Sequence, residues 1–599
     1  MSATRLRSTS ILVILAVVSI TACVSVQGLW RGGEGDGWKR TIRSDALGYY
    51  GYLQAIFIRK DLGNEEFVRE YVNITPNGTL NKYFAGTSVL MAPWFGIGHA
   101  LAMQDGSVPQ DGTSAYEQKA ISAGAWVYLL LGLLAMRALF LGIGVRDGVV
   151  AWTMAGLALG TPLLQYAAMQ PGWSHIYSFS AIAAFLLAIH RLAIGGSFRW
   201  AFAAALLLGL IVLIRPVNAM VVLAIPIVAG PNTKALLQRM FGHRKQLLIA
   251  VVLTSVVVAI QPMLWFAQTG KLIEWGYANE GFYWTRPELF KVLFGFRRGL
   301  FLYTPLMLLA ALGAVLLWRK DRQRASWTMA YWAVSSYIIS CWWIWYYGGG
   351  FGSRVYIDHY PVLTIAMVLM LHQWTAKRWL AARLFIVLCI GLNLAQLWQY
   401  HNGLIHHECM DRQRYFYTFL RFDDTHKNKL GGNYQEAPYH PNGMDVILTE
   451  SCDLDNPCHY WSGEWIDHDL AFSNRKVCSF SSTANYGIEF QAGTEVLPTD
   501  RWLFLEVGLQ RYDGEPEGSM PILGVTEVRT AKDSISFYQP FPMNPVPGTP
   551  YQWEQLEYRI PVPPLAEGDR LYFYLWNQDY AGGCLIDDVF MRVSAVRPY

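Results

Sequence analysis

The sequence predicts an α-helical membrane bundle of about eleven transmembrane helices, followed by a C-terminal β-sandwich, and three observations predict this fold class. The chain has 599 residues, of which 53% are hydrophobic and 24 are Trp, a composition too apolar for an ordinary soluble enzyme. Up to about residue 400 the apolar residues occur in blocks that match the thickness of a hydrocarbon core. Beyond that point the blocks stop, and short runs with a period of two residues begin.

Eleven apolar segments are expected to cross the membrane. They are Ile11–Leu29, Ala120–Leu141, Val149–Met169, Ile176–His190, Trp200–Ile214, Val217–Ala229, Leu247–Phe266, Phe301–Trp318, Trp327–Trp345, Tyr360–His372 and Leu384–Trp398. Basic residues fall in alternate gaps between them, for example at Arg5, Arg146, Arg199, Lys234 and Arg319, and Lys and Arg mark cytoplasmic loops. An odd number of spans then places the N-terminus inside and the chain after about residue 400 outside. We therefore expect a multi-pass protein of the bacterial inner (plasma) membrane with a periplasmic C-terminal domain.

Two apolar segments allow a second interpretation. The run that ends in Ile20-Thr21-Ala22-Cys23 resembles a lipoprotein cleavage box, so the first span is either a removable signal or, as we favour, an uncleaved anchor. The stretch Tyr83–Leu101 is interrupted by Pro93 and several glycines, and counting it as a span would invert the charge rule downstream. We expect a juxtamembrane or partly embedded helix pair there.

The chain then divides into four zones. Residues 1–30 form the first anchor, 31–119 a large outer loop with interfacial helices, 120–400 the rest of the bundle and 401–599 an outer β domain. Five of the eight cysteines lie in the last zone, which predicts an oxidising compartment with one or two disulfides and favours Cys452 and Cys458 as a pair. A zinc site using His459 and His406 or His407 is the alternative, although no paired C-x-x-C spacing is present.

Alternating apolar residues predict strands in the last zone. The alternating positions are Leu556, Tyr558, Ile560 and Val562, then Leu571, Phe573 and Leu575, then Val589, Met591 and Val593. Separated by turn residues, such runs indicate an antiparallel sandwich. The ending, from Tyr574 to Val589, resembles the closing strands of jelly-roll carbohydrate-binding modules over about twenty residues. This resemblance implies sugar binding, and the alternative is a sandwich that only supports the bundle or contacts a partner.

The first outer loop contains a carboxylate at the start of an expected helix. Ser44 is a plausible N-cap, which puts Asp45 in the first turn, and Asp45, Tyr49 and Tyr52 share one stripe at helical spacing. A Tyr-rich amphipathic helix favours the interface plane, where the helix N-terminus would keep Asp45 ionised at the level of the lipid headgroups. The alternative is an interfacial helix whose Asp45 only caps its own first turn.

The order of motifs resembles that of a known enzyme superfamily. Arg43–Ile58 is followed by Asn77–Pro93, which contains Lys82 and Tyr83, and this order is similar to the GT-C superfamily of membrane glycosyltransferases, especially its protein O-mannosyltransferase and aminoarabinose-transferase branches. The resemblance implies an inverting transferase with Asp45 as general base and Lys82 on the donor phosphate. The acidic pair of the family is a single Asp45 here, and Phe84-Ala85 stand in place of its prolines. Catalysis by the base alone is therefore favoured, and a divalent cation stays an open alternative.

Further outer groups are candidates for substrate binding. Arg215 lies at the tip of a membrane hairpin, as a phosphate ligand or as a snorkelling side chain. The Gly-rich segment Tyr346–Tyr360 offers Arg354 as a bidentate phosphate fork, or an internal Arg354–Asp358 pair. Lys82, Arg215 and Arg354 are thus the expected phosphate ligands. The expected substrate-binding residues are Tyr49, Tyr52, Tyr83, His175, Tyr347 and Asp358, with a structural role as the alternative for His175.

Several motifs are absent from the sequence. It contains no G-x-G-x-x-G, no G-x-x-x-x-G-K-[ST], no H-E-x-x-H and no G-x-S-x-G, so a nucleotide-sugar or ATP substrate is not expected and nucleic acid is not a credible partner. A polyprenyl-phosphate sugar delivered within the membrane is the expected donor, and a glycan, lipid or protein is the acceptor. The alternatives are a glycan polymerase or ligase, a non-enzymatic lipid-glycan transporter and a glycan-binding membrane protein.

Overall fold

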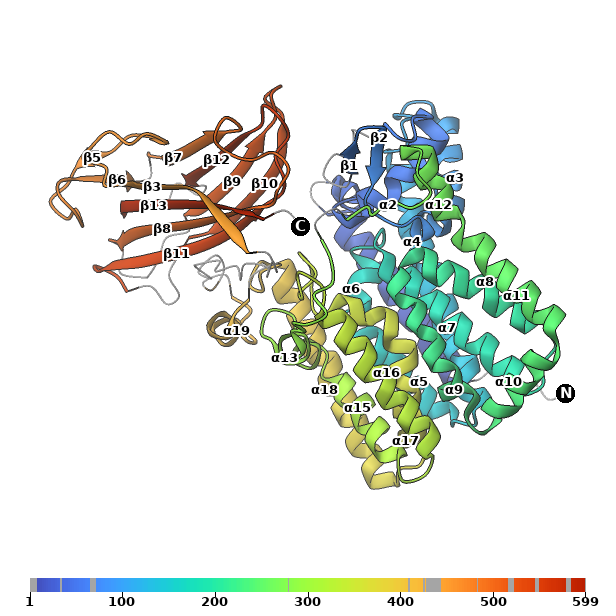
Figure 1. Ribbon diagram of the computed structural model, residues 1–599. Coiled ribbons are helices and arrows are strands. Elements are labelled where there is room, and N and C mark those ends of the chain that lie inside the picture. Colours follow the sequence, from blue (N-terminus) through green and yellow to red (C-terminus); the bar gives the residue numbers. More distant parts are fainter. Residues whose placement is uncertain are drawn as a thin grey trace. The chain divides into compact units, whose positions relative to one another are not determined.

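The computed structural model describes residues 8–32, 35–64, 72–277, 280–407, 410–423, 426, 443–481, 483–514, 522–543, 549–577 and 583–597. The chain forms two compact units, Met1–Leu397 and Trp398–Tyr599 (Figure 1). The division falls close to residue 400, where the sequence changes from apolar blocks to alternating runs.

The first unit is a helical bundle. Its α-helices are α1 (Thr9–Ser25), α2 (Asp45–Leu53), α3 (Gly86–Asp105), α4 (Ala115–Gly142), α5 (Asp147–Leu159), α6 (Leu163–Ala168), α7 (Ser174–Ala193), α8 (Arg199–Ile214), α9 (Ile225–Ala229), α10 (Thr233–Gly242), α11 (Arg244–Val258), α12 (Ile260–Thr269), α13 (Leu289–Phe294), α14 (Leu300–Tyr303), α15 (Leu306–Leu317), α16 (Arg322–Ser340), α17 (Tyr360–His372) and α18 (Ala376–His401), which continues into the second unit. Short helical segments are η2 (Val26–Trp30), η4 (Gly37–Arg40), η5 (Gln54–Arg59), η7 (Pro216–Ala224), η8 (Gly230–Asn232) and η9 (Arg354–His359). A hairpin of β1 (Val72–Thr75) and β2 (Gly78–Asn81) completes it.

Seven helical segments of the described residues are long and apolar enough to cross a membrane. They are Thr9–Trp30, Ala115–Gly142, Ser174–Ala193, Pro216–Gly242, Arg244–Thr269, Arg354–His372 and Ala376–His401, and α5, α8 and α15 are shorter apolar helices. This does not reproduce the expected count of eleven. One reason is that Val149–Met169 is not one helix: α5 ends at Leu159, and Pro162, which has no backbone N–H to donate, stands before α6.

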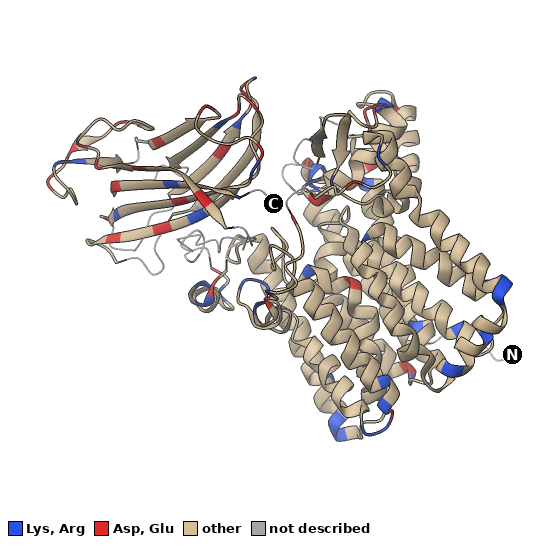
Figure 2. Ribbon diagram, in the orientation of Figure 1, with Lys and Arg blue, Asp and Glu red and all other residues tan. Residues whose placement is uncertain are grey.

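The exposed surface of the bundle is that of a membrane protein. Helix α11 has no buried residue, and its Leu248 and Val256 are 64% and 63% exposed. A contiguous apolar surface of this kind faces lipid rather than water. Charged residues gather near the ends of the helices, and the middle of the bundle is almost uncharged (Figure 2). The chain is thus a multi-pass membrane protein, and its bacterial inner-membrane location and topology stay predictions.

The expected helix pair at Tyr83–Leu101 is one continuous helix, α3, with Pro93 inside it. Two of the glycines that suggested a break, Gly86 and Gly98, are instead points of close packing. A Cβ on Gly86 would lie 2.4 Å from the backbone nitrogen of Ile214 in α8, and one on Gly98 would lie 2.5 Å from the Cα of Glu117 in α4. The absence of a side chain therefore lets neighbouring backbones touch.

The second unit contains two antiparallel sheets. Its strands are β3 (Met444–Cys452), β4 (Trp461–Ser462), β5 (Ile466–Asp467), β6 (Lys476–Phe480), β7 (Tyr486–Gly493), β8 (Leu503–Asp513), β9 (Leu523–Arg529), β10 (Ile535–Pro542), β11 (Trp553–Val562), β12 (Arg570–Trp576) and β13 (Cys584–Val596), preceded by helix α19 (Arg412–Thr418). The order is β10-β9-β12-β7-β4 in one sheet and β11-β8-β13-β6-β5 in the other, where β3 also pairs with β13.

One core fills the space between the two sheets. Tyr558, Phe573 and Met591 come from different strands and are all buried in it, as the alternating runs of the sequence predict. The β-sheet domain is therefore confirmed, whereas a jelly-roll connectivity stays a prediction.

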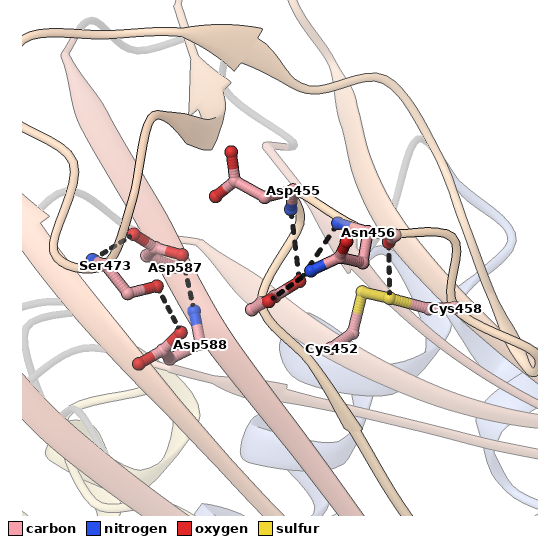
Figure 3. Close-up of a disulfide and its surroundings, with 8 residues drawn as sticks. Cys452, Asp455, Asn456, Cys458, Ser473, Asp587 and Asp588 are labelled. Atoms are coloured by element: carbon pink, nitrogen blue, oxygen red, sulfur yellow. Dashed lines mark hydrogen bonds between the residues drawn. A yellow bond between two sulfur atoms is a disulfide. The ribbon is translucent and has the colours of Figure 1, made fainter.

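A disulfide joins Cys452 and Cys458, the pair favoured by the sequence (Figure 3). Cys452 is therefore not available as a zinc ligand, and Cys409 lies outside the described residues. Cys478 and Cys584 are free and buried, and burial raises the pKa of each thiol to about 12. Beside the disulfide, the buried carboxylate of Asp587 accepts the N–H groups of Phe472 and Ser473, which attaches that loop to β13.

Candidate active site

Asp45 is the first residue of α2, as the sequence predicts, but its surroundings differ from the prediction. Ser44 precedes the helix with φ at +55°, and its side chain makes no capping hydrogen bond. Nearly all of α2 after Asp45 is buried against the rest of the bundle, and its placement at the membrane interface stays a prediction. A tyrosine hydroxyl of this helix has a partner within the protein: Tyr50 donates to the carbonyl of Gly112. Asp45 thus belongs to an enclosed site.

Two groups hold the carboxylate of Asp45. Arg354 places Nη1 3.1 Å from Oδ2, and the Tyr83 hydroxyl donates to Oδ1 at 2.9 Å. Burial by itself would raise the pKa of Asp45, but the charge of Arg354, the Tyr83 hydrogen bond and the more distant Arg215 and Lys82 outweigh burial and lower it. Asp45 is consequently a carboxylate at neutral pH.

Arg354 is enclosed by aromatic and backbone groups. Its guanidinium lies 4.2 Å from the ring centroid of Trp173 and donates to the backbone carbonyl of Tyr347. Among the described residues, its Nε is buried and has no hydrogen-bond partner. An internal Arg354–Asp358 pair was the alternative for this segment, and it is wrong, since Arg354 binds Asp45 instead.

A second carboxylate, that of Asp358, belongs to η9, the same short helix that contains Arg354. Asp358, which is 1% exposed, has Oδ1 3.0 Å from Nδ1 of His175, and its Oδ2 accepts from Nδ2 of Asn218 at 2.8 Å. Arg215 approaches Oδ2 to 4.0 Å, so it compensates a buried charge rather than snorkelling to the surface. The Nε2 atom of His175 has no hydrogen-bond partner among the described residues.

Ser174 connects the two carboxylate centres. Its Oγ accepts from Nε of Arg215 at 3.1 Å and lies 3.2 Å from the hydroxyl of Tyr49 on α2. Tyr49 packs on Tyr83 with ring centroids 4.6 Å apart, and Tyr83 in turn lies 6.2 Å from Tyr277. The adjacent rings of Tyr49, Tyr83 and Tyr277, which we term the tyrosine row, therefore lie between Arg215 and Asp45.

Lys82 lies next to the Tyr277 end of the tyrosine row and already has an acidic partner. It pairs with Glu280, and its ammonium lies 5.2 Å from the centroid of Tyr277. The sequence-based site did not include Glu280, Tyr277, Ser174 or Asn218. In the sequence, Ser174 and Asn218 stand close to His175 and Arg215, and Tyr277 and Glu280 lie in the aromatic-rich segment between two expected spans.

Tyr52 and Tyr347 support the backbone instead of facing the carboxylates. Tyr52 donates to the carbonyl of Tyr83 at 2.8 Å, and Tyr347 donates to the carbonyl of Ile339 at 3.0 Å. The glycines after Tyr347 were expected to approach a ligand. A Cβ on Gly350, whose φ is +147°, would instead lie 2.7 Å from the hydroxyl of Tyr166, so this glycine lets the chain pass a buried tyrosine.

The described residues of this site carry balanced charges. Asp45, Asp358 and Glu280 are the acidic groups, and Arg354, Arg215 and Lys82 are the basic ones. All ten residues singled out in the sequence lie in or directly beside this network, and their roles toward a substrate stay predictions. Chemically, the network offers an ionised carboxylate next to cations suited to a phosphate.

No protein-family model matches the chain, and no curated protein matches it. Similar solved structures include two sugar-transferring enzymes and one sugar-binding domain. The oligosaccharyltransferase AglB from Archaeoglobus fulgidus, in complex with an inhibitory peptide and a dolichol-phosphate, is 12% identical with a TM-score of 0.36, and the match covers 63% of this chain and 54% of AglB. The arabinosyltransferase EmbB from Mycobacterium smegmatis is 14% identical with a TM-score of 0.33, covering 100% of this chain and 65% of EmbB.

The sugar-binding domain is the CBM22-1 xylan-binding domain of Paenibacillus barcinonensis Xyn10C. It is 11% identical with a TM-score of 0.19, and the match covers 27% of this chain and 100% of that domain. The chain spans about half of AglB, and similarities this distant assign no substrate or partner to it.

Proposed function

We propose that the chain is an inverting membrane glycosyltransferase that moves a sugar from a polyprenyl-phosphate donor to an extracytoplasmic acceptor. The observation that carries the proposal is the ionised Asp45 at a helix N-terminus, held between Arg354 and Tyr83 in a membrane bundle. In the reaction, the acceptor oxygen attacks the anomeric carbon, and the bond from that carbon to the phosphate oxygen breaks. Asp45 takes the acceptor proton, and the phosphate leaves as an anion.

The ion pair between Asp45 and Arg354 makes Asp45 a weak base before the donor binds. A donor phosphate is a stronger partner for a guanidinium fork, so its arrival would draw Arg354 away from the carboxylate. With that cation shared, burial raises the pKa of Asp45, and the carboxylate becomes a better proton acceptor. Arg354 therefore couples the presence of the donor to the strength of the base.

An apolar groove supports a lipid-linked donor. It has a volume of about 930 Å³ and lies between α13, α15 and α16, with Leu293, Val315 and Trp332 among its lining residues. Ser336 also lines it and accepts a hydrogen bond from the Tyr356 hydroxyl at 2.8 Å. Tyr356 belongs to η9, the helix that also holds Arg354 and Asp358. An isoprenoid chain in this groove would thus lie next to the helix that carries the phosphate ligand.

The test is the substitution Asp45→Asn, with Asp36→Asn as the matched control. Asp36 is a carboxylate of the same loop, but its side chain is about 59% exposed and, within the described residues, its ion pair is with Lys39. Purified protein receives a panel of polyprenyl-phosphate hexoses and pentoses with oligosaccharide acceptors, and release of free polyprenyl phosphate is measured. We expect Asp45→Asn to lose activity by about 100-fold or more, the usual contribution of a general base, and Asp36→Asn to retain it. Equal activity of Asp45→Asn and wild type, at equal yield and membrane insertion, would remove Asp45 from the mechanism.

A further inference from the structure

One outer face of the β domain carries a row of aromatic residues. In β12, Leu571, Phe573 and Leu575 point into the core, so Tyr572, Tyr574 and Trp576 lie on the opposite, outer side of the five-stranded sheet. Tyr486 of β7 and Tyr538 of β10 are exposed by 64% and 44%. These five residues, Tyr486, Tyr538, Tyr572, Tyr574 and Trp576, form what we term the aromatic face.

The register of the strands places these rings side by side. Tyr486 is directly opposite Trp576, and their rings stack with centroids 6.4 Å apart and planes within 9° of each other. In the next row, Tyr574 is opposite Glu489, and in the row after that Tyr572 is opposite Glu527, which faces Tyr538. From Tyr572 to Trp576 the face extends about 13 Å along the strand.

Hydrogen-bonding groups lie between the rings. Glu527 is 2% exposed, accepts from the Tyr574 hydroxyl at 3.2 Å and pairs with Arg529. The Arg529 guanidinium lies 5.0 Å from the centroid of Tyr572. Burial and the nearby Glu527 raise the pKa of Glu489 despite the opposing charge of Arg529. Glu489 and Glu527 lie in the rows next to the stacked rings, whereas Arg529 and Arg570, which are opposite each other, lie beyond Tyr572. An anionic ligand stacked on Tyr486 and Trp576 would therefore meet a carboxylate first.

The other outer face of the domain combines ion pairs with half-buried rings. On the six-stranded sheet, Glu506 pairs with Arg559 at 3.0 Å and with Arg592 at 2.9 Å. Such ion pairs are the ordinary composition of a solvent-exposed sheet face. This face also carries aromatic residues, since Trp553 and Tyr512 are opposite each other with ring centroids 5.6 Å apart, but Trp553, Tyr512 and Phe590 are half-buried. The aromatic face differs in that Tyr486 and Tyr538 are exposed, which leaves ring surface free for a ligand.

We propose that the aromatic face binds a neutral, hydroxyl-rich glycan chain. The apolar faces of sugar rings would stack on Tyr486, Trp576 and Tyr574, and their hydroxyls would bond to Glu489, Glu527 and the tyrosine hydroxyls. A flat face with a stacked pair of rings suits an extended chain better than a compact branched one. The proposal stands without the proposed function, because it uses contacts within the β domain only.

The experiment measures glycan binding by the full-length protein in detergent, using isothermal titration calorimetry. The neutral probes are cellohexaose, xylohexaose and mannohexaose, and hexagalacturonate is the anionic probe. We expect at least one neutral hexasaccharide to bind, and hexagalacturonate to bind at least tenfold more weakly. Tyr486→Ala and Trp576→Ala should each weaken binding by about tenfold through loss of a stacking surface.

Tyr551→Ala is the matched control, since Tyr551 is 56% exposed in a turn outside the aromatic face, and it should bind as wild type does. Should Trp576→Ala fail to fold, Tyr538→Ala on the edge strand β10 tests the same face. Asp45→Asn should retain glycan binding even where transfer is lost, so failure of the two proposals can be told apart. Absence of binding to every neutral probe, tighter binding of hexagalacturonate, or unchanged binding by the variants of the aromatic face would overturn the proposal.

Discussion

At the scale of single residues, ionisation of the site depends on pairs that join distant parts of the chain. Asp45 follows the first span, whereas Arg354 lies more than three hundred positions further on, and the two side chains meet at 3.1 Å. Buried charges of this kind persist only when they are paired. The pairing therefore sets both the geometry of Asp45 and the pH range in which Asp45 is charged.

The acid limb of kcat/KM should report this pairing. Because the pKa of Asp45 is lowered in the folded protein, activity should persist as pH falls through about 3.9, the ordinary Asp value, and decline only below it. In Arg354→Gln the largest lowering influence is gone and burial remains, so the decline should begin at a higher pH. The measurement is kcat/KM against pH for both proteins, within the range where each stays folded. Coincident acid limbs would contradict the proposed coupling.

The sequence predicted which residues gather but not how they pair. Asp45, Lys82, Arg215 and Arg354 stood out as polar groups next to apolar segments, and that signal is local. Pairing depends on distances between helices, which periodicity does not encode. Glu280 was missed for this reason, because its role in the site follows from its ion pair with Lys82, which the sequence does not show.

At the scale of elements, the contact between α3 and α8 positions two of the basic groups. Lys82 and Tyr83 lie just before α3 begins, and Arg215 lies just after α8 ends. Gly86 lets these helix ends touch, because even a Cβ there would lie 2.4 Å from the Ile214 nitrogen. The closest approach of the two helices is thus next to the site.

Gly86→Ala should separate the two helices. Forcing a methyl group against backbone atoms costs about 1 to 3 kcal/mol, and transfer activity should fall as Lys82 and Arg215 move apart. Gly96→Ala is the matched control in the same helix, since nothing lies within 4 Å of its added Cβ. Thermal unfolding midpoints in detergent and the transfer assay measure the two effects. Similar midpoints for both variants would show that the contact tolerates a side chain.

Glycine was also the residue that misled the sequence-based assignment of elements. The glycines and Pro93 of Tyr83–Leu101 predicted an interrupted segment, but the same residue serves close helix packing in α3. Apolar blocks predicted helices in the bundle because stretches of that length and composition match a hydrocarbon core. Whether a glycine bends a helix or admits a neighbour depends on what packs there, and one sequence does not contain that information.

At the scale of the whole molecule, the chain joins a membrane bundle to a β domain with its own core. The change of pattern near residue 400 predicted this division, because blocks suited to lipid and alternating runs suited to a half-buried sheet are physically different signals. The orientation of the strands in two sheets was not predictable, since it depends on long-range pairing.

The disulfide should stabilise the β domain. Cys452 and Cys458 close a loop of only a few residues, for which removal costs about 2 kcal/mol by the loop-entropy relation. The double variant Cys452→Ser, Cys458→Ser should unfold at a lower temperature, measured by far-ultraviolet circular dichroism of the β signal. A thiol reductant should lower the midpoint of wild type and of the control Cys23→Ser but leave the double variant unchanged. A reductant effect on the double variant would place the stabilising bond elsewhere.

The balanced charges around Asp45 have a kinetic consequence. An acceptor alcohol that enters an empty site meets a carboxylate whose oxygens are already occupied by Arg354 and Tyr83. In the proposed mechanism, Asp45 becomes a stronger base once a donor engages Arg354, so we expect substrates to add in order, with the lipid-linked sugar first. Before the donor binds, Asp45 would then be too weak a base to activate water.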